Sequence, residues 1–322
     1  MKTFSIGNIK LKNPVLLSPM VDVTDLPYRL ICKKNGAALS YTEMLHIESL
    51  IQIQNNNPKS IRLIDKIKTT KKEFPVGIQT TGRSVVEFKQ ASKILHQLVP
   101  KKFNLIDINC GCPSHLTLDN QSGAYLLNNP KIISEIISFL KDENFIVTAK
   151  IRKGYDKDNP LKVSKIIERA GADAITIHGR LANQGRSIPA DWSIIKKAKK
   201  NIGIPVIGNG DINSPKKVEE MLDIADGAMI ARAAIGNPLI FKNALYYLKT
   251  GKEKEFSFKE NIKQFNDYLS LSKRYDLIDL TRIKYLGSNF IREIDHASSI
   301  RNDVMKLKSI EEIESFIKPL SK

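Results

Sequence analysis

Cysteine is scarce in this 322-residue sequence, and its spacing excludes two common uses. The three cysteines, Cys32, Cys110 and Cys112, cannot all pair as disulfides, and Cys110-x-Cys112 lacks the second half of a zinc-binding pattern. Unpaired thiols are typical of a reducing compartment. We therefore expect a cytoplasmic protein that binds no metal.

Long apolar runs are also missing. The N-terminal residues Met1–Phe4 do not open a signal-peptide core, and no uninterrupted apolar run approaches the roughly 20 residues that a membrane-spanning helix needs. The sequence has no Gly-x-Gly-x-x-Gly fingerprint, no internal repeat and no low-complexity tract. These absences argue against a membrane partner and against a separate dinucleotide-binding domain.

Acidic side chains are few relative to basic ones. The chain has 51 Lys and Arg residues against 34 Asp and Glu residues, a formal net charge of +17 at pH 7. Residues 245–322 carry 15 basic and 12 acidic side chains, which leaves +14 on residues 1–244. This excess favours a polyanionic partner, nucleic acid above all, without choosing between RNA and DNA. The alternative is a lysine-rich composition spread over solvated helix faces.

Apolar runs bounded by turn signals predict eight strands in the first 235 residues, separated by helical patterns such as Val85–Leu98. Successive strands start about thirty residues apart, the size of a βα unit. The sequence therefore predicts a (β/α)8 TIM barrel, with a doubly wound open sheet as the alternative. The predicted strands are Val15–Leu17, Leu39–Thr42, Val76–Gln79, Leu105–Ile108, Ile146–Ile151, Ala174–Ile177, Pro205–Ile207 and Ala228–Ile230.

The alternation of strands and helices ends after Asn237-Pro238. Beyond it, apolar side chains recur at helical spacing, as at Ile262, Phe265 and Leu269. We predict a catalytic barrel over residues 1–244 and a small all-α domain over residues 245–322. The glycine at 251 and the charged run 252–255 have the character of a linker.

A polar or flexible residue follows every predicted strand. Because the active sites of (β/α)8 barrels are built at the carboxyl ends of the strands, these residues are candidates for function. Gly208 and Gly210 precede a predicted helix with Ser214 at its N-cap, so backbone amides there can face a phosphorylated ligand or cofactor.

One strand end carries a thiol. The run Leu105–Ile108 is followed by Asn109, and two residues later Gly111-Cys112-Pro113 breaks the chain. A side chain on a loop held by a rigid scaffold is well placed for chemistry, so Cys112 is a candidate reactive group. A small buried cysteine is the alternative, and this is the role we expect for Cys110.

Taken in order, these motifs resemble those of the tRNA-dihydrouridine synthases. The resemblance runs along the whole predicted barrel, and the helical tail matches more loosely through Arg282–Leu286. The barrel segments that carry it are Ser18–Asp25, Tyr41–Met44, Asp107–Pro113, Lys150–Arg152, His178–Arg180, Gly208–Ile212 and Gly236–Phe241.

The resemblance implies an enzyme that uses FMN, reduced by NADPH, to saturate the C5–C6 bond of specific uridines in tRNA. Hydride would pass from reduced FMN to C6, and Cys112, as a protonated thiol, would give a proton to C5. Asn109, Arg186 and Glu43 would contact the substrate. The residues implied in FMN binding are Pro19, Met20, Val21, Gln79, Lys150, His178, Asn209, Gly210, Asp211, Ala231 and Arg232.

The chain departs from the family pattern at Ala231, where members usually carry glycine. A methyl group there crowds the cofactor phosphate, unless the backbone needs no positive φ. Two other functions compete with the synthase. One is a flavin barrel oxidoreductase acting on a small pyrimidine of the dihydroorotate or dihydropyrimidine type, and the other is an RNA-binding scaffold without turnover. We expect the protein to be a monomer.

Overall fold

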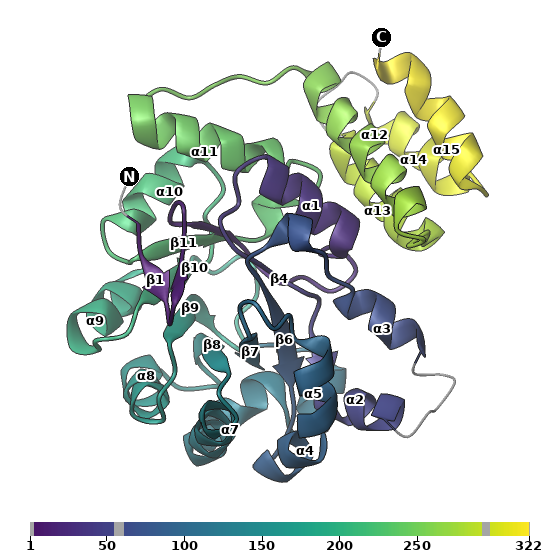
Figure 1. Ribbon diagram of the computed structural model, residues 1–322. Helices are drawn as coiled ribbons and strands as arrows, with labels where there is room; N and C mark the ends of the chain where they lie inside the picture. Colours follow the sequence, from purple (N-terminus) through teal and green to yellow (C-terminus); the bar gives the residue numbers. More distant parts are fainter. Residues whose placement is uncertain (1–2, 55–60, 292–296, 322) are drawn as a thin grey trace.

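The computed structural model describes residues 3–54, 61–291 and 297–321 (Figure 1). Eight parallel strands pair in chain order around a barrel, and a bridge between Leu16 and Leu39 brings the first strand back beside the second. The predicted (β/α)8 barrel is confirmed, and the doubly wound open sheet is excluded. The barrel strands are β3 (Val15–Leu17), β4 (Ser40–Tyr41), β6 (Val76–Thr81), β7 (Leu105–Cys110), β8 (Ile146–Gly154), β9 (Ala174–Leu181), β10 (Val206–Asn209) and β11 (Gly227–Ile230).

Helices connect the strands and cover the outside of the barrel (Figure 1). Several begin at the residues that sequence favours for a helix start; Ser214, for example, accepts a hydrogen bond from the backbone N–H of Lys217, and proline follows it at the first helical position. The helices are α1 (Leu26–Lys34), α2 (Ile47–Gln54), α3 (Ile61–Ile67), α4 (Val85–Gln90), α5 (Ser92–Leu98), α6 (His115–Asp119), α7 (Pro130–Asp142), α8 (Pro160–Arg169), α9 (Ser193–Asn201), α10 (Pro215–Leu222) and α11 (Leu239–Thr250), with short 3-10 helices η2 (Lys71–Glu73), η3 (Gly123–Asn128) and η4 (Arg232–Ala234).

Some elements differ from the prediction. The predicted helix Val85–Leu98 is two helices, because the backbone turns at Ala91, where ψ is −1°. Several strands continue beyond their predicted ends, since parallel pairing persists through Asn109 with Lys150 and Arg152 with His178. Three two-residue strands were not predicted, because they are too short to show alternation: β1 (Ser5–Ile6), β2 (Ile9–Lys10) and β5 (Leu45–His46).

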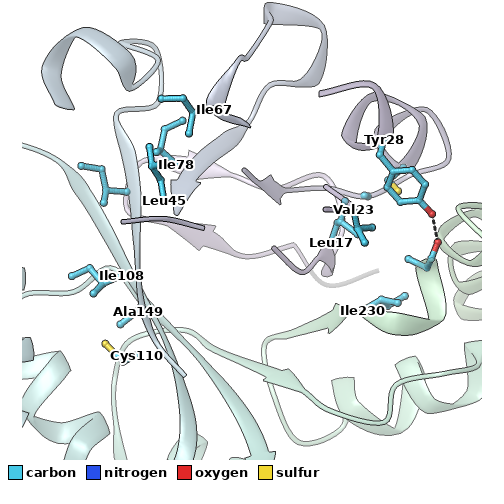
Figure 2. Close-up of a cluster of buried hydrophobic side chains, with 14 of the residues drawn as sticks. Leu17, Val23, Tyr28, Leu45, Ile67, Ile78, Ile108, Cys110, Ala149 and Ile230 are labelled. Carbon is cyan, nitrogen blue, oxygen red and sulfur yellow. Dashed lines mark hydrogen bonds between the residues drawn. The ribbon is translucent and has the colours of Figure 1, made fainter. Parts of the chain in front are cut away.

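Side-chain alternation along the strands separates two apolar clusters. On β7, Ile106, Ile108 and Cys110 belong to the cluster between the strands and the helices, part of which Figure 2 shows. Leu105 belongs to the second cluster, where side chains from the strands meet the β1–β2 hairpin. The alternate residues Asp107 and Asn109 therefore face the barrel interior, at its carboxyl end.

The C-terminal residues form a helical domain beside α1 (Figure 1). The predicted boundary at residue 244 is wrong, because α11 runs unbroken to Thr250 and ends at Gly251, which has the left-handed φ of +70° that glycine adopts without strain. The linker is thus residues 251–257. The domain contains α12 (Phe258–Arg274), α13 (Leu280–Phe290), α14 (Ala297–Lys306), α15 (Ile310–Ile317) and the 3-10 helix η5 (Lys318–Ser321).

Across the described part of the chain, every helix falls short of the length and apolar character that crossing a bilayer requires.

Candidate functional site

The loop after β7 holds Cys112 in a fixed position. The side-chain oxygen of Asn109 accepts hydrogen bonds from the backbone N–H groups of Gly111 (3.0 Å) and Cys112 (2.8 Å). Arg152 of β8 donates from Nε to the Gly111 carbonyl at 2.7 Å. Two backbone N–H groups and one backbone carbonyl of the loop are therefore hydrogen-bonded to side chains. Cys112 itself is partly exposed at the barrel mouth.

The sulfur of Cys112 lies among hydroxyl groups that sequence reasoning missed. Sγ is 3.4 Å from the Ser114 hydroxyl, to which it donates, and accepts from the Thr117 hydroxyl at 3.4 Å. Those two hydroxyls are 2.7 Å apart. Ser114 is the N-cap of α6 and accepts from the Thr117 backbone, so the pattern Ser114-x-x-Thr117 after the loop was the available signal.

The other two thiols are unavailable for chemistry. Cys110 has no exposed surface and faces the helices, as predicted from its place one residue out of phase with Asn109. Burial and the nearby Asp107 carboxylate raise the pKa of Cys110. Cys32 of α1 is equally buried, and burial raises its pKa as well. Cys112 is thus the accessible thiol of the three.

A chain of buried polar side chains runs from the barrel interior to the Cys112 loop. Asn109 donates from Nδ2 to Oε1 of Gln79 at 3.0 Å, and Gln79 donates from Nε2 to Asp107 at 2.7 Å. Thr148 of β8 donates to the other carboxylate oxygen of Asp107 at 2.6 Å. Burial raises the pKa of Asp107 to about 6. Gln79 and Asn109 are thereby each left with one side-chain N–H for a ligand.

Positive charge is concentrated around His178 on β9. Burial and the charges of Lys150, Arg152, Arg180 and Arg232 lower the pKa of His178 to about 2, so its ring is neutral at physiological pH. Its Nδ1 atom is buried and has no hydrogen-bond partner among the described residues. Burial, followed by the charge of Arg152, lowers the pKa of Lys150 to about 8. The mouth is therefore electropositive and suited to an anionic ligand.

A cavity of about 320 Å³ lies between the ends of β9, β10 and β11. Gly210 has a φ of +109°, and a Cβ atom there would lie 2.9 Å from that of Ala190, so this turn requires glycine. Six of the residues predicted to hold FMN line the cavity: His178, Asn209, Gly210, Asp211, Ala231 and Arg232.

The structure adds detail at two of those residues, Asp211 and Ala231. Asp211 accepts from Arg180 with both carboxylate oxygens, at 2.7 and 2.6 Å, and from the backbone N–H of Ala190 at 2.8 Å. Its charge is therefore matched by Arg180, which leaves the cavity positive. Ala231 has a φ of −116°, so its backbone does not take the positive φ that would favour glycine.

The loop after β3 forms another side of the mouth. Pro19 and Met20 are partly exposed, and the Val21 side chain is 47% exposed. Glu43 accepts a hydrogen bond from the backbone N–H of Asp22 at 2.9 Å, which fixes the end of this loop. The predicted contact of Glu43 with substrate is wrong, because its side chain has no exposed surface and pairs with Arg282 at 2.9 Å.

Arg282 joins the helical domain to the barrel through buried ion pairs. Its guanidinium contacts Asp25 at 3.1 Å as well as Glu43, and the Tyr268 hydroxyl donates to the same Asp25 carboxylate at 2.9 Å. Burial raises the pKa of both carboxyl groups, and Arg282 partly offsets the rise. We refer to these four residues, Asp25, Glu43, Tyr268 and Arg282, as the interdomain ion cluster.

Arg186, the remaining predicted substrate residue, lies in the connection between β9 and α9 with its side chain exposed. Its carbonyl accepts from Arg180 at 3.3 Å. The described residues contain no group of three or more His, Cys, Asp and Glu side chains that could hold a metal ion.

Solved structures share the barrel fold. A 2-naphthoyl-CoA reductase in complex with 2-naphthoyl-CoA superposes with a TM-score of 0.59 at 15% identity, over 76% of this chain and 52% of that one. An old yellow enzyme homologue from Zymomonas mobilis gives a TM-score of 0.53 at 10% identity, over 83% and 98%. At these identities the likeness shows the fold alone.

Sequence comparison shows the family. Residues 16–316 match the family model described as dihydrouridine synthase (Dus). The tRNA-dihydrouridine synthase B of Proteus vulgaris is 33% identical over 281 residues, which cover 83% of this chain and 84% of the relative. That of Pseudomonas putida is 35% identical over 257 residues, covering 78% and 74%. The chain belongs to the dihydrouridine synthase family.

Proposed function

We propose that this member of the dihydrouridine synthase family is an FMN-dependent enzyme that reduces the C5–C6 bond of specific uridines in tRNA, with NADPH as the electron source. The observation that carries the proposal is the position of Cys112. It is the accessible thiol of the three, held at the barrel mouth beside Lys150 and Arg152. The name tRNA-dihydrouridine synthase B of the similar proteins supports tRNA as the substrate.

The residues at the mouth fit FMN. The cavity between β9 and β11 has Arg232 and the glycine turn at Gly210, which together suit a phosphate group. The buried and unpartnered Nδ1 of His178 offers a polar contact that a ligand would complete. Lys150 would contact the anionic pyrimidine end of the bound flavin, and Gln79 would use its remaining N–H at the flavin edge. Asn209 would support the phosphate turn, since it donates to the Met229 carbonyl at 2.8 Å.

The loop Pro19–Val21 would lie under the isoalloxazine ring, where partly exposed apolar side chains exclude water from its face. When bound and reduced, FMN supplies the hydride that adds to C6 of the uracil ring.

Cys112 would complete the reduction. Its S–H bond breaks as a C–H bond forms at C5, and the electron pair stays on sulfur as a thiolate. The side chains of Lys150 and Arg152 lie near that sulfur, and a proton from solvent restores the thiol because Cys112 is partly exposed. Asn109 would orient the uracil with its remaining side-chain N–H, and Arg186 would contact the same base from the β9–α9 connection.

Substrate access accounts for the charge. A uridine must leave its stack to reach the bottom of a barrel mouth, so the protein must hold the surrounding RNA. The net charge of +14 on residues 1–244 would bind phosphates at the rim, and the helical domain would orient the tRNA. NADPH would reach the flavin through the same mouth, in alternation with uridine. These substrates would place the reaction in the cytoplasm, where we expect a monomer.

Nucleoside mass spectrometry tests the proposal. Cellular tRNA from a strain that lacks dihydrouridine is incubated with the purified protein and NADPH, then digested and analysed. A dihydrouridine peak supports the proposal, and fragment mapping then identifies the reduced position. A protein that retains FMN and oxidises NADPH but forms no dihydrouridine would contradict it and favour a small pyrimidine. A protein that releases no FMN on denaturation, and cannot be loaded with it, would exclude flavin chemistry.

A further inference from the structure

We propose that Asp107 is a positioning residue for Cys112. Its carboxylate sets the orientation of the side-chain amides of Gln79 and Asn109, and Asn109 in turn holds the Cys112 loop. The inference rests on the proposed function of Cys112 as the proton donor. No reacting group is touched by Asp107 itself.

Asp107 is an obligatory acceptor at one end of this hydrogen-bond chain. Asp107 is 1% exposed, and both of its oxygens accept hydrogen bonds, from Gln79 at 2.7 Å and from Thr148 at 2.6 Å. An ionised carboxylate cannot donate, so the amide of Gln79 must turn its NH2 group toward Asp107. The carbonyl oxygen of Gln79 must then point the other way.

At the other end of the hydrogen-bond chain, two backbone N–H groups are obligatory donors. The Gln79 oxygen faces Asn109, which therefore turns its NH2 group toward Gln79 at 3.0 Å. The Asn109 oxygen is left facing the backbone N–H groups of Gly111 and Cys112, which can only donate. A flip of either amide would place two donors or two acceptors in contact at a buried site and leave those groups unsatisfied.

This hydrogen-bond chain matters because it positions Cys112, whose thiol must be placed accurately to react. The backbone N–H of Cys112 is 2.8 Å from the Asn109 oxygen, so a turn of that amide displaces the residue that carries the thiol. Misplacement of a reacting group by about 1 Å can slow a reaction on the order of a hundredfold.

A purely electrostatic role for Asp107 is the competing explanation, because its charge acts on Lys150. Two substitutions separate the roles. In Asp107→Asn the side-chain oxygen can still accept from Gln79 while its NH2 group donates to the Thr148 hydroxyl, which can accept. That variant keeps the orientation and loses the charge, whereas Asp107→Leu loses both.

The experiment combines a thiol probe with a reaction. Alkylation of Cys112 by iodoacetamide, followed by intact mass, reports its position without any substrate, since Cys32 and Cys110 are buried. Single-turnover reduction of tRNA uridine reports the reaction, and flavin reduction by NADPH reports the rest of the site. Thr176→Val is the matched control, because that buried hydroxyl faces the same interior and has no hydrogen-bond partner among the described residues.

We expect Asp107→Leu to alkylate several-fold faster than wild type and to reduce uridine roughly 10- to 100-fold more slowly, with a smaller loss in flavin reduction through the contact of Gln79 with the flavin edge. Asp107→Asn should stay within about threefold of wild type in both assays, as should the control. Equal losses in the Asn and Leu variants would show that charge is what matters and overturn the proposal, as would wild-type behaviour of the Leu variant.

Two outcomes need a second measurement. If Asp107→Leu does not fold, Gln79→Leu breaks the same chain one link closer to the loop, and its alkylation rate decides: a faster rate supports the proposal and an unchanged rate overturns it. If wild-type protein forms no dihydrouridine, the proposed function fails, and the alkylation rates of the Asp107 variants still decide whether Asp107 positions the loop.

Discussion

The two buried polar assemblies of this molecule differ in how they use charge. The chain from Asp107 through Gln79 to Asn109 contains one carboxylate and two neutral amides, each in a single orientation. The interdomain ion cluster instead pairs two fully buried carboxylates, Asp25 and Glu43, with the guanidinium of Arg282. Amides transmit direction because a flip mismatches donors and acceptors, whereas ions fix position through attraction that tolerates small shifts.

The two assemblies also hold different sides of the mouth. The amide chain ends at the Cys112 loop, and the ion cluster ends at the loop that carries Met20 and Val21, through the bond from Asp22 to Glu43. We therefore expect damage to the amide chain to affect the reaction more than stability. Damage to the ion cluster should do the reverse.

The largest effect on stability is expected from Arg282→Met. Removing the guanidinium leaves two buried carboxylates without their cation, which costs about 3–5 kcal/mol of the free energy of unfolding. Urea denaturation measures this loss, with Lys284→Met on the same helix as the control. Below its melting temperature, the Arg282 variant should alkylate Cys112 at the wild-type rate. A loss under about 1 kcal/mol would show that the interdomain ion cluster contributes little to stability, and the contrast with the amide chain would not hold.

A smaller effect is expected from the titration of Asp107. Because burial raises its pKa from 3.8 to about 6, the folded state binds this proton more tightly than the unfolded chain does. The group therefore lowers the free energy of unfolding as pH rises from about 4 to about 6, and not further above that range. Asp107→Asn lacks this titration, so its free energy of unfolding should rise by up to about 3 kcal/mol relative to that of wild type across this pH range.

Urea denaturation of wild type and Asp107→Asn between pH 4 and pH 7.5 measures the difference directly, and titrations common to both proteins cancel. A difference that stays flat through this range would show that Asp107 has the same pKa in the folded and unfolded states. Thr176→Val should show no such pH-dependent difference from wild type.

The smallest effect is expected from Tyr268→Phe, which removes one donor from Asp25 and leaves Arg282 in place. The loss of a hydrogen bond to a charged group should lower the free energy of unfolding by about 1.5–3 kcal/mol, at the lower end here because Asp25 keeps its cation. Thermal denaturation beside the exposed Tyr285→Phe variant measures it. A loss as large as that of Arg282→Met would mean that the hydroxyl, not the ion pair, is the main contact.

Much of the barrel and its mouth could be predicted because the relevant signals are local. Strand spacing indicates the fold, and the residue at the carboxyl end of each strand is placed by the barrel itself. Alternation on one strand also predicts that Cys110 and Asn109 face opposite sides. The same alternation would have placed Asp107 inward with Asn109, but its position in an apolar run hid it.

The errors have a common cause. The predictions for Glu43 and for the boundary at residue 244 failed because both depend on contacts far along the sequence. Glu43 is buried by Arg282 of α13. Helix α11 continues past residue 244 because its apolar face packs on the barrel. Local patterns do not contain such contacts. The hydroxyls of Ser114 and Thr117 differ, because the pattern Ser114-x-x-Thr117 is local and only their contact with the Cys112 sulfur depends on the path of the loop.

The most direct test of the account compares Cys110, at the end of β7, with Cys112, in the loop that follows, in a single turnover. Protein carrying reduced flavin is mixed with dihydrouridine-free tRNA, and dihydrouridine is quantified over time. We predict that Cys112→Ala slows its formation on the order of 10²–10⁴-fold while NADPH still reduces the flavin at the wild-type rate, and that Cys110→Ala reacts nearly as wild type does. Equal losses in the two variants, or full activity in Cys112→Ala, would contradict the assignment of Cys112 as proton donor.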